Sequence, residues 1–276
     1  MTRQLQRYLV GGTAIVASVF IFLVPFAFII LTAVKDRKSA STRSFDWPVE
    51  WHFWDNLVEV IQTRDYMLII AFINSTVLTV ASVAILVVLS AMVAYVVQRR
   101  RSRWNGLINF LVLSGLIIPP AVVPTVWVLQ KLGLFKTLGG LILVEVAFGL
   151  SFCILLFRAF IATIPRDLDE AAIIDGAGPV RLFFKVIFPL LKSVIVTVVI
   201  VQSVIIFNDF AYPLYFLPGD ENATVQLTVF NFQSQFNTQY NLLFADILLI
   251  TIPPLLLYLF LNRRIVEGLT AGAVKG

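Results

Sequence analysis

Three long stretches of this chain contain no charged residue, and they limit what the protein can fold into. The uncharged stretches are residues 8–34, 66–98 and 104–130. Each exceeds the ~20 apolar residues that a helix needs to cross a bilayer. A mean hydropathy of +0.91 and 59% hydrophobic residues are too apolar for a soluble domain of 276 residues. The sequence therefore predicts an all-α membrane protein.

Three further apolar stretches complete six predicted transmembrane helices in a single domain, residues 1–276. The predicted spans cover about 9–34, 67–97, 105–129, 138–157, 186–208 and 241–262. The fourth contains Glu145 and the sixth contains Asp246. The third carries Pro119, Pro120 and Pro124. Because proline removes a backbone donor and bends a helix, we expect the third span to be broken.

The positions of Lys and Arg predict a cytoplasmic N-terminus and C-terminus. With this orientation most of the 21 basic residues lie inside, whereas residues 209–240 contain none and lie outside. Lys35, Arg37 and Lys38, directly after the first span, are the exception. The net charge of +5 then reflects topology and attraction to anionic lipid, and nothing supports nucleic-acid binding.

The segment 164–189, between the fourth and fifth spans, has the pattern of two short helices at the membrane surface. Asp167 and Glu170 have the spacing of a capping box. Gly176 and Gly178 suit the left-handed end of a helix, and Pro179 suits the start of the next. One face of the first helix would carry Leu168, Ala171 and Ala172, with Asp169 and Asp175 off that face. Such a small-residue face lets a partner approach closely.

This segment resembles a known motif. Glu170-Ala171-Ala172 followed by Gly176 resembles the EAA loop in the membrane-spanning subunits of binding-protein-dependent ABC importers. The resemblance continues in the manner of the carbohydrate-type (maltose-type) permeases through Asp175-Gly176-Ala177, Phe184, Ile187 and Pro189-Leu190-Leu191. It implies a type I ABC importer transmembrane domain whose cytoplasmic coupling helix docks on an ATPase subunit. The coupling residues implied are Asp167, Glu170, Ala171, Ala172, Asp175, Gly176 and Ala177.

Other segments resemble the same family. They are Asn74-Ser75 and Ala94-Tyr95 in the second span, Leu132-Gly133-Leu134 with Thr137, and Asn208-Asp209 with Pro213-Leu214. Phe207 stands where the family usually has tryptophan. The tail resembles that of carbohydrate-type subunits, which implies contact with the ATPase by Gly268, Leu269, Thr270, Gly272 and Lys275.

Polar residues near the outer ends of the spans are candidates for the translocation path and for binding-protein contact. Polar groups in lipid are costly unless they face protein or water. We therefore place Asn74, Gln202, Asn208 and Asp209 on the path, with helix–helix hydrogen bonding as the alternative. Gly219, Asp220, Glu221 and Asn222 would contact the binding protein, or form a solvated loop. Glu145 has either a structural partner or a role in translocation.

The outer loop after the first span contains an aromatic cluster formed by Trp47, Trp51, Phe53 and Trp54. Aromatic rings of this kind favour the membrane interface. The cluster is either an interfacial belt or a contact surface for an extracytoplasmic partner.

The sequence contains no phosphate-binding Gly-x-x-x-x-Gly-Lys-Ser/Thr motif, so ATP hydrolysis must occur elsewhere. His52 and Cys153 are the only residues of their types, and we predict no Ser-His-Asp, Cys-His or metal site. We therefore predict a transport subunit, not an enzyme, with no cofactor of its own. ATP and Mg would bind the partner ATPase subunits.

The resemblance implies a permease that forms half of the path of an ATP-driven importer for a di- or oligosaccharide. Its partners would be a second homologous permease, two ATPase subunits, an extracytoplasmic sugar-binding protein and the lipid bilayer. Its place would be the bacterial or archaeal cytoplasmic (inner) membrane. The alternatives are an ion-driven secondary carrier or channel, and an ABC importer for a polyol or glycerol phosphate.

Overall fold

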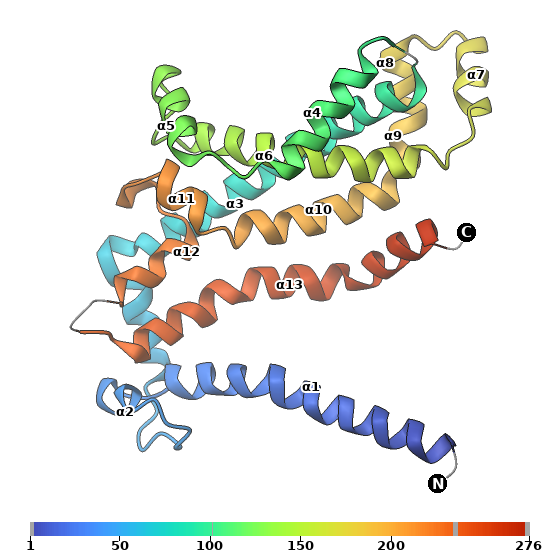
Figure 1. Ribbon diagram of the computed structural model, residues 1–276. Coiled ribbons are helices and arrows are strands. Elements are labelled where there is room, and N and C mark those ends of the chain that lie inside the picture. The colour runs from blue at the N-terminus through green and yellow to red at the C-terminus, as the bar shows by residue number, and fades with distance from the viewer. Residues whose placement is uncertain (1–2, 101, 234–236, 274–276) are drawn as a thin grey trace. The chain divides into compact units, whose positions relative to one another are not determined.

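The computed structural model describes residues 3–100, 102–233 and 237–273, and of residues 3–9 and 261–273 it describes the backbone alone. Within these ranges every regular element is helical (Figure 1). The longer helices are α1 (Arg3–Ala33), α3 (Phe53–Arg99), α4 (Asn105–Ile117), α5 (Val122–Lys131), α6 (Leu138–Ile161), α7 (Asp167–Ile174), α10 (Lys192–Phe207) and α13 (Tyr240–Ala273). Shorter elements are α2 (Arg37–Ser41), α8 (Pro179–Leu182), η1 (Phe183–Ile187), α9 (Phe188–Leu190), α11 (Ala211–Phe216), η2 (Asp220–Asn222), α12 (Val225–Thr228) and η3 (Val229–Asn231).

Four described helices are long and apolar enough to cross a membrane, and two bent pairs bring the number to six. The four are α1, α3, α6 and α13. In the first pair, α4 and α5 meet at 118° across Pro119 and Pro120, where the sequence predicts a break. In the second, the segment Pro179–Leu190 meets α10 at 76°. The all-α membrane fold predicted from the sequence is confirmed.

The chain packs as two compact units. Unit 1 comprises residues 1–69 and 225–252, and unit 2 comprises residues 70–224 and 253–276. The prediction of a single domain over 1–276 stays a prediction. The two units are described separately below.

Unit 1 is held by amide hydrogen bonds at the end of α1. Asn56 Nδ2 donates to the carbonyl oxygens of Ala33 at 2.8 Å and Lys35 at 2.9 Å. Asn241 Nδ2 donates to Asn56 Oδ1 at 2.8 Å, so α13 joins the same network. Buried polar groups that are satisfied in this way fix one register between helices. Within α3 the backbone leaves helical geometry over Thr63–Tyr66, which separates its first ten residues from the long apolar part.

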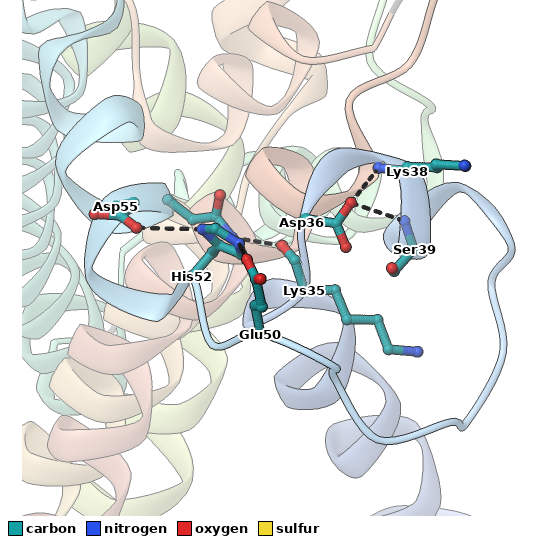
Figure 2. Close-up of polar contacts among 8 residues, drawn as sticks. Lys35, Asp36, Lys38, Ser39, Glu50, His52 and Asp55 are labelled. Atoms are coloured by element: carbon teal, nitrogen blue, oxygen red, sulfur yellow. Dashed lines mark hydrogen bonds and ion pairs between the residues drawn. The ribbon is translucent and has the colours of Figure 1, made fainter.

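The loop after α1 begins with a capped turn of helix. Figure 2 shows Asp36 accepting hydrogen bonds from the backbone N–H groups of Lys38 at 3.0 Å and Ser39 at 3.3 Å. These bonds start α2, because they satisfy donors that have no partner within the helix. In the same view His52 lies between Glu50, 3.5 Å away, and Asp55, 3.3 Å away. The aromatic side chains of Trp47, Trp51 and Trp54 are exposed, and the choice between belt and contact surface stays open.

Unit 2 is built around α6. This helix packs against α4, α10 and α11, and it contains much of the buried apolar core. Core residues with little or no exposed surface include Leu86, Ala91, Cys153, Phe157, Ile161, Ile187, Leu191 and Val198. In Figure 1, α7 and α8 lie at one end of unit 2, and α5 and α11 lie at the other end. The two ends carry the two groups of candidate residues.

Candidate functional site

The first group of candidate residues surrounds α7. The structure corrects the predicted capping box at its start, because α7 begins at Asp167 with Arg166 as the N-cap and no side-chain cap. The carbonyl of Arg166 accepts hydrogen bonds from the N–H groups of Asp169 and Glu170. With the cap one residue earlier than predicted, Asp167 and Glu170 both project outward and are exposed.

The end of α7 is a Schellman turn. Gly176 has φ +78°, its N–H donates to the Ile173 carbonyl, and the N–H of Ala177 donates to the Ala172 carbonyl, both at 2.9 Å. The left-handed position thus falls on glycine, which lacks the Cβ that would clash there. Gly178 has φ −67° and does not take the left-handed conformation, which corrects that half of the prediction. Pro179 is the first residue of α8, as predicted.

A buried ion pair fixes α7 to the end of α3. Asp169 is 8% exposed, and its Oδ1 accepts a hydrogen bond of 2.6 Å from the Tyr95 hydroxyl. Its Oδ2 lies 3.2 Å from an Arg99 guanidinium nitrogen, which also donates to the Ile164 carbonyl at 2.9 Å. One arginine therefore holds both the segment before α7 and the helix itself. The sequence analysis placed Asp169 off the small-residue face of this helix and did not predict its ion pair with Arg99.

The faces of α7 also differ from the prediction. Asp169 and Ala172 form the buried face, whereas Leu168 and Ala171 are exposed. Ile174 is 85% exposed, and Ile173 and the C-cap Asp175 are exposed as well. Beside α7 lies a groove of about 460 Å³, lined on one side by basic residues that include Arg99, Arg100 and Arg166. The exposed side of α7 thus carries two isoleucines.

The second group lies at the opposite end of unit 2, where α6, α10 and α11 enclose a cavity of about 260 Å³. It is lined by Glu145, Phe148, Gly149, Phe152, Gln202, Ile205 and Tyr212. Gln202 is 4% exposed and lines this cavity, and its place on the translocation path stays a prediction. Asp209 neighbours Glu145 and accepts hydrogen bonds from the N–H groups of Ala211 and Tyr212, so it caps α11. The pairing of α6 with α10 and α11 at this point has no signal in the sequence.

The other predicted path and loop residues lie nearby in unit 2. Asn208 is exposed and donates to the Val204 carbonyl one turn back, at 2.8 Å. Asn74 donates to the carbonyl oxygens of Glu221 and Ala223, so it holds the loop after α11. Asn222 donates to the Lys136 carbonyl at 3.3 Å. Gly219, Asp220 and Glu221 are exposed. The roles of all these residues stay predictions.

The predicted tail residues lie at the C-terminal limit of the described residues. Gly268, Leu269, Thr270 and Gly272 belong to α13, whose backbone alone is described there, and Lys275 lies outside the described residues. Nothing in the structure bears on their contact with an ATPase.

Comparison with known proteins agrees with these findings. The model of the family "binding-protein-dependent transport system inner membrane component" matches residues 87–270. A melibiose/raffinose/stachyose import permease of Bacillus subtilis is 30% identical over 92% of this chain and 91% of its own length. A trehalose transport system permease of Mycobacterium tuberculosis is 37% identical over 75% of this chain and 77% of its own.

A solved bacterial ABC transporter that imports the acidic polysaccharide alginate has the same fold. One of its chains superposes with a TM-score of 0.82, 19% identity and coverage of 95% of this chain and 98% of that one. The family match spans α7 with its Schellman turn and the helices around the cavity. This chain therefore belongs to the family of inner membrane components of binding-protein-dependent transport systems.

Proposed function

We propose that this chain is one of two permease subunits of an ATP-driven carbohydrate importer, and that α7 is its coupling helix. In this function a separate ATPase docks on α7, and movement of α7 is passed to the membrane helices. A binding protein outside the membrane would deliver the sugar, and both termini would lie in the cytoplasm.

One observation supports the coupling role above the others: α7 is fixed on one face and free on the other. The buried pair of Asp169 and Arg99 ties it to α3, so a force on α7 acts on a membrane-spanning helix. Its outward face offers Ile173, Ile174 and Glu170 to a partner. A helix that only closed a loop would not need so much exposed apolar surface.

The carbohydrate cargo rests on the relatives. The permeases that match over most of this chain include those named for melibiose/raffinose/stachyose and for trehalose. An ion-driven carrier is the rival class. Uptake of a sugar by proteoliposomes that requires ATP and the co-purified ATPase supports the importer, and uptake driven by an ion gradient without ATP contradicts it.

Charge reversal at Glu170 tests the coupling role. Glu170→Lys should abolish co-purification of the ATPase or sugar-stimulated ATP hydrolysis, because losing one partner of a desolvated interfacial charge pair costs ~2–5 kcal/mol. The matched control is Glu59→Lys, a charge reversal at an exposed position of α3 in unit 1. If Glu170→Lys binds the ATPase and transports as the unmodified protein does, α7 is not the coupling helix.

A further inference from the structure

The groove beside α7 combines basic and apolar lining residues. Its volume is about 460 Å³, within the ~300–1,000 Å³ that is usual for small-molecule sites. Arg99, Arg100 and Arg166 contribute guanidinium groups, and Ile173 and Leu182 contribute apolar side chains. All of these residues belong to unit 2. A lining of this kind suits a molecule that has both an anionic group and an apolar part.

Arg99 is held in place and has one donor left over. Its side chain is 10% exposed, and its Nη2 donates to the Ile164 carbonyl at 2.9 Å and lies 3.2 Å from Asp169 Oδ2. Arg99 Nε is buried and has no hydrogen bond to any described residue. Because a buried donor without an acceptor is costly, this nitrogen indicates an acceptor from outside the chain. The groove is the place from which such an acceptor would come.

The other two arginines of the groove have open guanidinium groups. Arg100 and Arg166 are exposed, and within the described ranges neither guanidinium group is hydrogen-bonded or ion-paired. The planar fork of arginine matches the oxygens of a phosphate group, to which it can donate two parallel hydrogen bonds. A phosphate group in the groove would therefore supply acceptors for both residues.

The groove also contains two carboxylates, and they do not cancel its positive charge. Asp169 is ion-paired with Arg99 and accepts a hydrogen bond from the Tyr95 hydroxyl, so its charge is compensated. Glu170, which is exposed, is the other carboxylate among the described lining residues. It faces two exposed guanidinium groups, so a net positive charge remains in the groove. An anion is attracted to such a site.

The position of the arginines indicates that the anion is the headgroup of a lipid. Arg99 is the last residue of α3, and the apolar helix α4 begins at Asn105, so residues 100–104 connect two segments that are apolar enough to cross a membrane. Basic clusters directly beside a membrane helix bind anionic headgroups. A free phosphate would not use the apolar lining formed by Ile173 and Leu182, whereas the glycerol and acyl parts of a lipid would.

We propose that this groove binds the phosphate group of an anionic membrane lipid through Arg100 and Arg166. Arg100 directly follows α3 and Arg166 directly precedes α7, so a phosphate bound by both joins the two segments. The inference rests on the proposed function, since it requires that α7 lies at the cytoplasmic membrane surface. It also deepens that function: Glu170 and Ile173 line the groove and belong to the face proposed for the ATPase, so the lipid borders that contact.

The test maps lipid contacts of the complete transporter in nanodiscs. The discs consist of phosphatidylcholine with a small share of phosphatidylglycerol that carries a photoreactive acyl chain, and cross-linked peptides of this chain are quantified by mass spectrometry. Arg100→Gln combined with Arg166→Gln removes the proposed phosphate contacts. Arg181→Gln combined with Lys185→Gln is the matched control, because these exposed residues of unit 2 lose the same charge without lining the groove.

Phosphatidylglycerol should cross-link to the part of unit 2 that contains Ile173 and Leu182. The change at Arg100 and Arg166 should lower this cross-linking on the order of tenfold, because charge-assisted hydrogen bonds to the phosphate are lost. The control should stay within about twofold of the unmodified protein, as expected for surface substitutions. Equal cross-linking in the two double variants overturns the site.

A comparison of lipids needs no variant, so it keeps the test decisive if the double variant fails to assemble. Photoreactive phosphatidylcholine, whose choline group balances its phosphate charge, should cross-link to the groove on the order of tenfold less than phosphatidylglycerol. Equal cross-linking by both lipids means that the groove does not select an anionic headgroup and contradicts the proposal.

Two other occupants have distinct results. An excess of inorganic phosphate should leave the cross-linking by phosphatidylglycerol unchanged, and displacement of the lipid would assign the groove to a free phosphate. If phosphatidylglycerol gives no cross-links at the groove and the change at Arg100 and Arg166 weakens co-purification of the ATPase, the groove belongs to the contact with the ATPase. Either result overturns the lipid site.

The proposed function is tested separately, by ATP-dependent sugar uptake of the same preparation in liposomes. Absence of the groove cross-links with uptake intact contradicts the lipid site alone. Groove cross-links that are present without any ATP-dependent uptake contradict the proposed function alone.

Discussion

Asp169 and Glu145 are both buried carboxylates of unit 2, and their surroundings differ. Asp169 Oδ1 accepts a hydrogen bond of 2.6 Å from the Tyr95 hydroxyl, and Oδ2, which has no hydrogen bond, forms an ion pair with the Arg99 guanidinium at 3.2 Å. Glu145 has an acidic neighbour in Asp209 and one oxygen without a hydrogen bond, and it lines a cavity. The first arrangement holds two segments together. The second places two acidic side chains next to one another at the wall of a cavity.

The comparison separates two reasons for placing charge in a membrane protein. A carboxylate paired with arginine transmits position, since both partners must move together or expose an unpaired charge. A carboxyl group beside a second acid, as Glu145 is beside Asp209, has no cationic partner of this kind. We therefore expect changes at Asp169 to alter the attachment of α7, and changes at Glu145 to leave α7 attached.

The largest effect should follow Asp169→Ala. Removing one partner of a buried pair leaves Arg99 uncompensated, at a cost of ~3–5 kcal/mol. The segment around α7 should then open more often. In inside-out vesicles, trypsin should cut after the exposed Arg166 on the order of a hundredfold faster, because cleavage follows the population of the open form.

Asp175→Ala is the matched control, because Asp175 is an exposed acid at the other end of α7. Its cleavage rate should stay within about twofold of the unmodified protein, as expected for surface substitutions. Equal cleavage of the two variants would mean that the pair of Asp169 and Arg99 does not hold α7. Asp169 would then not differ from Glu145 in holding a helix in place.

A smaller effect is expected from the glycines after α7. Gly176→Ala places a Cβ at φ +78°, at a cost of ~1–2 kcal/mol, whereas Gly178→Ala at φ −67° is free of strain. Neither Cβ would meet a neighbouring atom within 4 Å, so the pair differs in backbone conformation and not in packing. In the same trypsin assay Gly176→Ala should be cut ~5–30-fold faster. Similar rates for both variants would show that the Schellman turn does not fix α7.

The sequence was informative about local features of this fold and uninformative about the pairings across it. The charge-free stretches gave the membrane helices, and Pro119 and Pro120 gave the break between α4 and α5. Gly176 and Pro179 gave the turn after α7, because such residues have strong local preferences. The motif also drew attention to Glu170, which the structure leaves exposed.

The partners of the two buried carboxylates were not predictable in this way. Tyr95 lies 74 residues from Asp169, and only the packing of α3 against the α7 segment brings them together. The spacing of Tyr95 and Arg99, one turn apart at the end of α3, was the single available signal. Gln202 and Glu145 likewise line one cavity because of the register of α6 against α10, which hydrophobic periodicity does not specify.

The smallest effect concerns a third carboxylate, Asp36, which is partly exposed and caps α2. The pKa of Asp36 lies below its usual 3.8, chiefly because of the hydrogen bond with the Ser39 side chain and also because of the backbone N–H groups of Lys38 and Ser39. A lowered pKa means that the charged form stabilises the folded turn. This stabilisation is fully present above pH 3.8 and is lost as the pH falls through the lower pKa of the folded state.

Removing Asp36 tests a carboxylate outside the membrane-spanning helices, for comparison with the buried Asp169 and Glu145. Asp36→Ala should destabilise α2 by ~1 kcal/mol, and Asp36→Asn by less, because asparagine is also a good N-cap. The measurement is hydrogen exchange at Lys38 and Ser39, corrected for intrinsic rates, from about pH 5 down to about pH 2. Protection should decline with acid in the unmodified protein and stay flat in Asp36→Asn. A decline of equal size in Asp36→Asn would assign the pH dependence to another group, since asparagine does not titrate. The stability of the α2 turn would then not depend on the charge of Asp36.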